Sequence, residues 1–332
     1  MTTTSNHSFN PDYFEKTWND YSTEDYDVVI IGGGSVGAGA AVDAATRGLK
    51  TAVLEARDFA AGTSSRSSKM FHGGLRYLAM FDFRLVAESL KERELNMSTL
   101  APHLVKPLKF IFPLTHRGWE RVMMFGGFTL YDLMGGAKSV PMQKHLTRKG
   151  VLKVTPGLKE DAVVGGVRYY DTLVDDARHT MTVLRTAAEY GASVRTGTEV
   201  TGFEKDARGR ITAAHVRDLE TGRETTVRGK VFINATGVWN DKIQDMAGAE
   251  GKFTVHASKG CAHRRAEGRP RCRGRPVLRY REVRAVCHPV GRVLDHRHHR
   301  YRLGEGPVPA GSGPDEGGYR LHSGPGQPAR AQ

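Results

Sequence analysis

Glycines at a characteristic spacing follow the first apolar run of the chain. Gly32, Gly34 and Gly37 form a Gly-x-Gly-x-x-Gly pattern, to which Gly33 adds a further glycine. In such a pattern the first glycine makes a tight turn, the second lets the backbone approach a pyrophosphate, and the third lets a helix pack closely on a strand. The phosphate then lies at the helix N-terminus, where free N–H groups and the helix dipole favour an anion. Alone this signal is weak, because glycine-rich turns are common.

The elements expected around these glycines make the pattern more specific. Residues 27–31 (DVVII) are a short β-branched run that predicts a buried parallel strand. Residues 38–47 predict a helix rich in small side chains, and residues 50–55 predict a second strand. Glu55 ends that strand, where its carboxylate can accept hydrogen bonds from ribose hydroxyls. The sequence therefore predicts a βαβ unit that binds a dinucleotide.

Hydroxyl and cationic side chains follow in the next loop. The clusters at residues 63–65 and 67–68 can hydrogen-bond a cofactor that runs from its phosphates toward a second domain. Residues 72–77 (HGGLRY) then place a cation beside a tight Gly-Gly turn. Each feature also has a purely structural alternative. The hydroxyls suit a solvated loop, Arg76 a surface salt bridge, and His72 a hydrogen-bonded loop histidine.

Further elements are expected along the first 260 residues. They are amphipathic helices at 87–97 and 175–190, a hairpin of strands 193–203 and 211–217 turning at 206–209, and a buried strand at 231–235. The last of these resembles the strand at 27–31 and runs into Thr236 and Gly237. A nucleotide-binding domain interrupted by a second region is therefore expected.

The positive charge of the chain is concentrated near its end. The net charge is +13, and residues 261–332 carry +9 of it through 15 arginines and 6 acidic residues. Scattered arginine among Pro, Gly and His with few aromatics favours disorder over a nucleic-acid surface, so no nucleic-acid partner is expected. All three cysteines also lie there, and no disulfide framework or metal site is predicted for the first 260 residues.

Two apolar or terminal segments bear on localisation. Residues 1–26 are polar and acidic without the apolar core of a signal peptide, and we expect a mobile leader in the cytoplasm. The longest apolar patch, residues 122–134, is shorter than the roughly 20 residues that span a bilayer. The segment 119–138 could touch lipid at its apolar side chains, but packing in a core is favoured.

Several of these segments together resemble a known family. Residues 32–55, 63–78, 83–86 and 174–178, with Asn234-Ala-Thr-Gly237 and Trp239 as the last match, resemble the FAD-dependent, aerobic glycerol-3-phosphate dehydrogenases. The resemblance covers about residues 27–260, and the run SSKMFHGGLRYL is its most specific part. It implies an α/β fold with a Rossmann-like FAD-binding domain of the glutathione-reductase/D-amino-acid-oxidase type. FAD-binding segments at about 27–80 and 175–245 would be accompanied by an incomplete α+β substrate domain.

The resemblance also assigns roles to residues. The ADP half of FAD would be held by Gly32, Gly33, Gly34, Gly37 and Glu55. The pyrophosphate and the approach to the flavin would be lined by Thr63, Ser64 and Ser68. A second turn against the cofactor would be formed by Ala235, Thr236 and Gly237. Arg76 with Tyr77 would hold the substrate phosphate, in agreement with the preference of phosphate for guanidinium. His72 would lie close to the flavin and is the candidate catalytic residue.

The implied reaction is the oxidation of sn-glycerol 3-phosphate to dihydroxyacetone phosphate. The hydride would pass to FAD while a base takes the hydroxyl proton. Family members pass the electrons to membrane quinone, which implies peripheral attachment to the inner face of the cell membrane. Two alternatives stay open: an oxidase that uses oxygen, and a flavoprotein with an Arg-rich extension that binds nucleic acid or membrane.

The resemblance ends after Gly260. The family continues with a His-Ile-Val-Val-Pro segment and later Gly-Thr-Thr-Asp, and neither occurs in this chain. Permissible codons for residues 297–303, read one base later, encode Gly-Thr-Thr-Asp-Thr-Asp-Trp, and residues 261–265 and 283–290 yield further family segments in the same frame. We therefore interpret residues 261–332 as an irregular tail produced by a frameshift, and predict an inactive chain.

Overall fold

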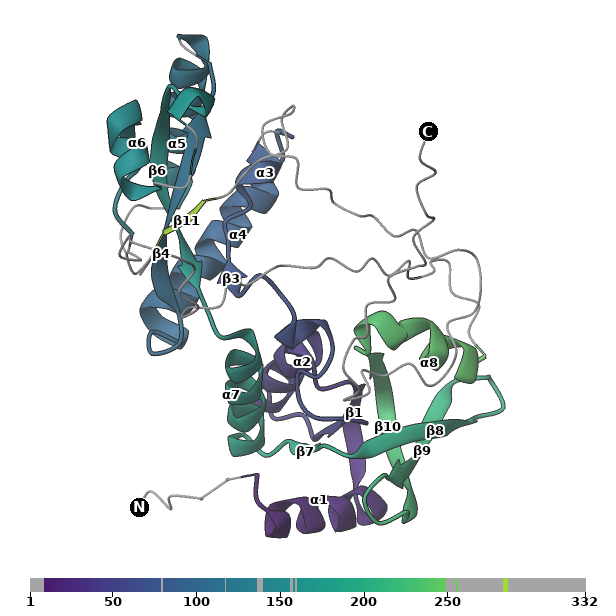
Figure 1. Cartoon of the computed structure of the whole chain (residues 1–332). Helices are drawn as coiled ribbons and strands as arrows, with labels where there is room; N and C mark the ends of the chain where they lie inside the picture. Colours follow the sequence, from purple (N-terminus) through teal and green to yellow (C-terminus); the bar gives the residue numbers. More distant parts are fainter. Residues whose placement is uncertain are drawn as a thin grey trace, which may run out of the picture. The chain divides into compact units, whose positions relative to one another are not determined.

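Two β-sheets organise the part of the chain that the structure describes (Figure 1). The computed structural model describes residues 9–78, 80–116, 118–135, 140–155, 158, 160–248 and 255, and the backbone of 283–285. The strands of the first sheet, in spatial order, are β7 (Ser193–Arg195), β2 (Thr51–Leu54), β1 (Asp25–Ile31), β10 (Glu224–Asn234), β9 (Ile211–Asp218) and β8 (Thr198–Lys205).

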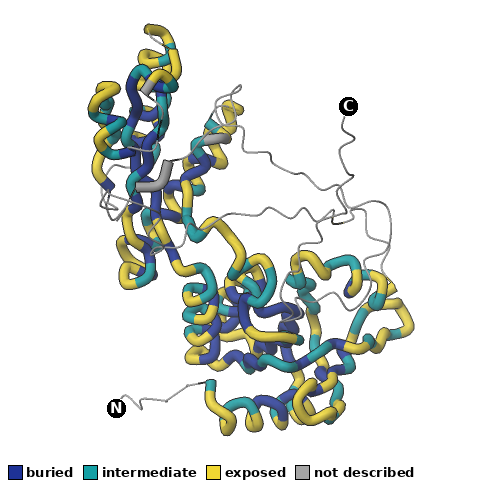
Figure 2. The backbone as a smooth tube through the Cα atoms, viewed as in Figure 1, coloured by how far each residue is buried: buried dark blue, intermediate teal, exposed yellow. Residues whose placement is uncertain are grey.

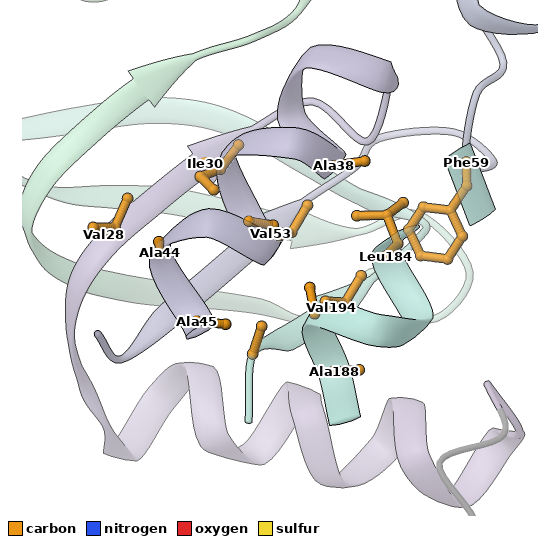
Figure 3. Packing of buried hydrophobic residues seen from close by; sticks show 13 residues of the cluster. Val28, Ile30, Ala38, Ala44, Ala45, Val53, Phe59, Leu184, Ala188 and Val194 are labelled. Atoms are coloured by element: carbon orange, nitrogen blue, oxygen red, sulfur yellow. The ribbon is translucent and has the colours of Figure 1, made fainter. Parts of the chain in front are cut away.

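The first sheet has a parallel core and an antiparallel arm. Strands β7, β2, β1 and β10 pair in parallel, and β9 and β8 continue the sheet as antiparallel neighbours. Helices α2 (Ser35–Thr46) and α7 (Asp176–Glu189) pack against each other and share an apolar cluster with the sheet (Figure 3). Its members include Val28, Ile30, Val53, Leu184 and four alanines of α2. The predicted βαβ unit is confirmed here, since β1, α2 and β2 follow one another in the expected order.

Residues 9–26 are ordered, contrary to the mobile leader predicted for this part of residues 1–26. Helix α1 (Pro11–Thr23) is capped by Asn10, whose side chain accepts a hydrogen bond from the N–H of Tyr13 at 2.8 Å. Trp18 and Tyr21 are buried, and the Tyr21 hydroxyl donates to the carbonyl of Val53 at 2.7 Å. The segment is polar on average, but one face of its helix is aromatic and packs against the sheet. Residues 1–8 lie outside the described residues.

The second sheet is built on one long antiparallel pair. Strands β4 (Lys106–Leu114) and β6 (Gly165–Leu173) pair along their whole length, and β3 (Met70–Phe71) and β5 (Lys144–Thr147) both pair with β6. The helices of this region are α3 (Leu75–Leu78), α4 (Phe83–Leu95), α5 (Trp119–Met134) and α6 (Arg148–Val154). Short 3-10 turns at Thr63–Ser65, Glu160–Ala162 and Gly237–Trp239, a π turn at Asn96–Leu100 and helix α8 (Asn240–Met246) complete the described elements.

The strand predicted as buried at 231–235 is the last part of β10, where no residue is buried and Val231 is 53% exposed. Two further predicted elements differ from those observed. The single strand predicted at 193–203 is two strands, because Gly197 has a left-handed φ of 64° and turns the chain between β7 and β8. The helix predicted at 87–97 begins at Phe83, since the Asp82 side chain caps it by accepting from the N–H of Leu85 at 3.1 Å. Both differences arise from local turn and capping chemistry.

Helix α5 bears out core packing for one face of residues 119–134 only. Phe128, Tyr131 and Asp132 are buried, whereas several other apolar residues of the helix are exposed. The tube in Figure 2 is coloured by this burial along the whole described chain. The exposed ones are Trp119, Val122, Met123, Phe125, Leu130 and Leu133. An apolar helix can bury only the stripe that faces its sheet, so a run that is apolar on all sides leaves the opposite face exposed.

Residues 261–332 lie outside the described residues except for one short strand. Strand β11 (Val283–Ala285) pairs in parallel with Lys109–Ile111 of β4, so the prediction of an irregular tail is wrong for these three residues. The edge of β4 offers unpaired N–H and C=O groups, which a passing extended segment satisfies. The three cysteines, Cys261, Cys272 and Cys287, lie outside the described part of the chain.

Candidate functional site

The glycine turn between β1 and α2 is as tight as its spacing predicts. Gly32 has a φ of 111°, and a side chain there would come within 2.6 Å of the Ala235 carbonyl oxygen. A Cβ on Gly37 would overlap the carbonyl oxygen of Gly32, so only glycine lets α2 lie this close to the end of β1. Gly34 is the N-cap of α2 and lies in extended backbone. The first N–H groups of the helix therefore meet the turn without an intervening side chain.

We expect Gly37 not to tolerate the methyl group of alanine, whereas Gly39 should tolerate it. We expect Gly37→Ala to lower the free energy of unfolding by about 1–3 kcal/mol, because the overlap is with backbone that has little room to move. The matched control is Gly39→Ala in the same helix, where nothing lies within 4 Å of the added carbon. This control should be stabilised by about 0.5–1 kcal/mol, since alanine is the better helix former. Urea denaturation of both variants measures the difference; equal midpoints would contradict the close packing.

The Glu55 carboxylate is tied to the same turn. It accepts hydrogen bonds from the N–H of Gly33 at 2.6 Å and from the N–H of Arg57 at 2.7 Å. The Arg57 guanidinium lies 4.9 Å from the ring centroid of Trp239, which is cation–π geometry. Glu55 thus holds a fixed place at the end of β2, beside the glycine turn.

The hydroxyl loop docks on both helices of the nucleotide sheet. The Ser64 hydroxyl accepts from the N–H of Ser35, the first residue of α2, at 2.9 Å. The Ser67 hydroxyl donates to Asp176 at 2.6 Å, and Lys69 forms an ion pair with the same carboxylate. Burial works against the charge of Asp176, yet the hydrogen bonds from Lys69 and Ser67 hold its pKa below the usual value. An ionised Asp176 at the start of α7 therefore anchors the loop.

The second predicted turn follows β10 and lies against the first. The N–H of Ala235 donates to the Ile31 carbonyl at 2.8 Å, which continues the pairing of β10 with β1. The Thr236 hydroxyl donates to the Asn234 side chain at 2.6 Å, and Gly237 has a φ of 59°. Residues 234–237 therefore form a rigid turn at the carboxyl ends of the parallel strands, where ligands bind in open α/β sheets.

The glycine turn, the hydroxyl loop and the turn after β10 all line one cavity of about 620 Å³. Its apolar lining includes Ile31, Leu54 and Val200. The predicted cofactor residues that line it are Gly32, Gly34, Glu55, Thr63, Ser64, Ala235, Thr236 and Gly237. Gly33, Gly37 and Ser68 are not among the lining residues. The volume lies within the range of about 300–1,000 Å³ that small-molecule and cofactor sites occupy. A helix N-terminus, hydroxyls and a carboxylate around an apolar cavity fit a dinucleotide cofactor.

Sequence reasoning missed other residues that line this cavity. They are Ser35, Arg57, Asp176, His179, Glu199 and Trp239. Asp176 and Trp239 stand inside segments that carried the resemblance, and His179 follows Asp176 by one helical turn, so a helical projection would have found it. Burial, with His103 nearby, lowers the pKa of His179 and favours a neutral imidazole. No local signal identifies Glu199, which reaches the cavity only through the sheet.

His72 and Tyr77 are not among the residues that line the large cavity. His72 is exposed and lines a smaller cavity of about 500 Å³ with Glu88, Ser89, Glu92, Arg93 and Asn96, among others. Met70 and Phe71 line both cavities. Tyr77 is 39% exposed, and the Arg76 side chain lies outside the described residues. The two residues of β3 therefore connect the large cavity with the segment that carries His72.

Comparisons with known proteins bear on this arrangement. The sequence model of the family described as DAO, FAD dependent oxidoreductase, matches residues 27–319. A glycerol-3-phosphate dehydrogenase of Mycobacterium leprae (strain TN) is 61% identical over 243 residues, which are 73% of this chain and 41% of that protein. Glycerol-3-phosphate dehydrogenase 2 of Mycobacterium bovis gives the same identity and coverage. The chain thus spans 41% of the length of these relatives.

The fold also resembles solved structures. The glycerol-3-phosphate dehydrogenase from Bacillus halodurans, solved in complex with FAD, has a TM-score of 0.54 and 27% identity. The match covers 70% of this chain and 38% of that one. The predicted α/β fold class with a Rossmann-like FAD-binding domain of the D-amino-acid-oxidase type is confirmed by these matches.

Proposed function

The chain belongs to the family of FAD dependent oxidoreductases, and on that premise we propose that the protein, with its reading frame restored after residue 260, oxidises sn-glycerol 3-phosphate to dihydroxyacetone phosphate. The similarity to the mycobacterial dehydrogenases supports this substrate. The observation that carries the proposal is that the two cavities share two lining residues. Met70 and Phe71 border the cofactor-sized cavity, and the next residue, His72, borders the smaller one. A substrate held by the HGGLRY segment would thus be next to the cofactor.

The residues of the large cavity fit FAD. The N-terminus of α2, with the Ser35 and Ser64 hydroxyls, would hold the pyrophosphate, and Glu55 would accept from the ribose. FAD, when bound, supplies a two-electron acceptor for the hydride that leaves the substrate carbon. The Arg76 guanidinium, with Tyr77, would bind the substrate phosphate. His72 is the candidate to take up the hydroxyl proton, because a neutral imidazole nitrogen can act as a general base.

The cofactor and the substrate can be tested together on purified protein. We expect the chain to carry a flavin, visible as a yellow colour and a flavin absorption spectrum. We also expect glycerol 3-phosphate, added without oxygen, to bleach that spectrum in an active form of the protein, whereas glycerol should bleach it much more slowly. A colourless protein that binds NAD instead would refute FAD binding. A yellow protein that another alcohol bleaches faster would refute the substrate.

A quinone is the electron acceptor that we propose, and oxygen is the alternative. Both accept two electrons from a reduced flavin, so the acceptor is decided by supplying each one separately. Reduction of a soluble quinone under anaerobic conditions, with little hydrogen peroxide formed in air, would support the dehydrogenase. Rapid peroxide formation in air would identify an oxidase.

We further propose that the protein works in the cytoplasm, attached peripherally to the inner face of the membrane. Along the described part of the chain, no helix is long and apolar enough to cross a bilayer. The support comes from α5, where Trp119 is 65% and Phe125 54% exposed. Tryptophan at the edge of an exposed apolar helix face is typical of membrane surfaces.

Vesicle binding tests this attachment. We expect the protein to sediment with phosphatidylglycerol–phosphatidylethanolamine vesicles, and the pair Trp119→Ser and Phe125→Ser to weaken binding about tenfold or more, because two large apolar side chains are lost. Tyr190→Ser is the matched control, since Tyr190 is 61% exposed but lies at the end of α7. Unchanged binding by the α5 pair, or a change in oligomeric state instead, would show that this face meets protein rather than lipid.

A further inference from the structure

A buried carboxylate lies beneath the turn that carries His72. The Asp171 side chain of β6 is 4% exposed, and its Oδ1 atom accepts three hydrogen bonds. The donors are the N–H of Gly73 at 3.1 Å, the Arg93 guanidinium at 2.7 Å and the Tyr131 hydroxyl at 2.9 Å. These donors come from the turn after β3, from α4 and from α5. One oxygen atom therefore joins three segments that are far apart in the sequence.

Asp171 stands where the strand pairing ends. In the antiparallel ladder Met70 pairs with Leu173 and Phe71 with Thr172, and β3 ends there. Asp171 is the next residue along β6, and its side chain takes the N–H of Gly73 just after the strand. This side-chain hydrogen bond therefore links β6 to the turn before α3, beyond the last backbone pair of the two strands.

The turn is also enclosed by bulky side chains. A Cβ on Gly73 would overlap the Leu90 side chain and the Tyr131 hydroxyl, so the backbone lies directly against α4 and α5. Gly74 has a φ of 73°, and its carbonyl accepts from the N–H of Tyr77 at 2.7 Å in the first turn of α3. The position of Gly73 therefore sets where α3 starts, and with it the backbone that bears the HGGLRY cation.

The surroundings keep all three donors in place. Arg93 is 3% exposed, and its guanidinium also donates to the Tyr170 carbonyl at 3.3 Å. Burial raises the pKa of Tyr131 well above its ordinary value, so its hydroxyl stays protonated and donates. Hydrogen bonds to a buried charged group are stronger than neutral ones, and loss of the charge leaves the others without their partner. Asp171 and its three donors therefore hold the turn at residues 72–74 in one position.

We propose that Asp171 is a positioning residue: through its bonds to Gly73, Arg93 and Tyr131 it fixes the His72–Gly74 turn, and thereby the residues that meet the substrate. The effect of Asp171 on catalysis rests on the proposed function. Its stabilisation of the His72–Gly74 turn does not depend on that function. Asp171 does not line either cavity, so it acts through the turn and not by touching the ligand.

Hydrogen exchange on the chain as it exists tests the hold on the turn. In Asp171→Asn we expect amides in the peptide of residues 70–78 to exchange at least tenfold faster, because the charged acceptor is gone. Tyr131→Phe, which keeps the ion pair, should give a smaller change in the same peptide and covers the case in which Asp171→Asn does not fold. The matched control is Asp218→Asn, whose carboxylate is fully buried and pairs with Arg195 at 3.0 Å in the other sheet. This control should leave residues 70–78 protected.

Kinetics test the catalytic consequence in protein that turns over glycerol 3-phosphate. We expect Tyr131→Phe and Asp171→Asn to reduce kcat/KM for glycerol 3-phosphate by about tenfold and more than a hundredfold, respectively, with flavin content unchanged. Asp218→Asn should retain kcat/KM per bound flavin. Unchanged exchange at residues 70–78 in both network variants would overturn the proposal. Faster exchange with unchanged kcat/KM would limit Asp171 to a structural role, whereas protein with the restored reading frame that lacks flavin or turnover would instead refute the proposed function.

Discussion

Removal of one nucleotide near codon 260 is expected to convert an inactive chain into one that oxidises glycerol 3-phosphate. The 332-residue chain should show no turnover above background, because the arginine-rich stretch at 261–332 contains no Ile, Phe, Met or Trp to build a packed core. The restored frame should instead encode the His-Ile-Val-Val-Pro and Gly-Thr-Thr-Asp segments that the resemblance requires. Flavin-dependent oxidation by the two proteins, measured side by side, gives the largest difference that we expect.

Two observations check this interpretation independently. The coding DNA must contain bases that yield the family segments in the shifted frame. The control for expression is flavin content, which separates a protein that lacks its cofactor from one that binds it without turnover. Robust oxidation by the unrepaired chain, or DNA that does not encode the family segments in the shifted frame, would show that residues 261–332 are translated in the correct reading frame.

Arg76→Ala is expected to lower kcat/KM for glycerol 3-phosphate by about 2–4 kcal/mol, or roughly 30- to 1,000-fold, in protein that turns over this substrate. A guanidinium binds phosphate through two parallel hydrogen bonds, and its loss leaves a charged group without a partner. Arg76→Lys should recover part of the loss, because an ammonium keeps the charge but not the paired geometry. Initial rates at varied substrate concentration give these values.

The controls for Arg76 use a second substrate and a second arginine. Glycerol has no phosphate, and its slow oxidation should be nearly the same in wild-type protein and in Arg76→Ala. Arg185→Ala removes the same group from an exposed position on α7 and should leave kcat/KM unchanged. Equal losses on glycerol and glycerol 3-phosphate would mean that Arg76 supports the fold instead of binding phosphate.

Local sequence was sufficient for the nucleotide-binding unit. The strand, glycine turn, helix and second strand are contiguous, and their conformations depend on near neighbours: a β-branched run, glycines that allow a tight turn, and small residues that let α2 pack. The same holds for Gly37, whose need for a hydrogen side chain arises from Gly32, five residues before it. Short-range steric rules therefore predict these residues without knowledge of the remaining fold.

Patterns of average polarity were less reliable. Residues 11–23 are polar on average, but Trp18 and Tyr21 are buried against the sheet, so the leader was misjudged. Residues 119–134 are apolar on average, but the helix buries one stripe and leaves Trp119 and Phe125 exposed. In both segments burial depends on which face meets a sheet, and that face is set by a docking partner far away in the chain.

The sequence by itself determined the cofactor class, the order of β1, α2 and β2, and the segments that carry the resemblance. Only the tertiary structure decided which distant residues complete the sites. Glu199 reaches the large cavity through β8, and Asp171 holds Gly73 across 98 positions of sequence. The physical reason is that sheet pairing and buried hydrogen bonds are long-range contacts, whose partners are chosen by strand register and packing. Residue type and local spacing do not encode that choice.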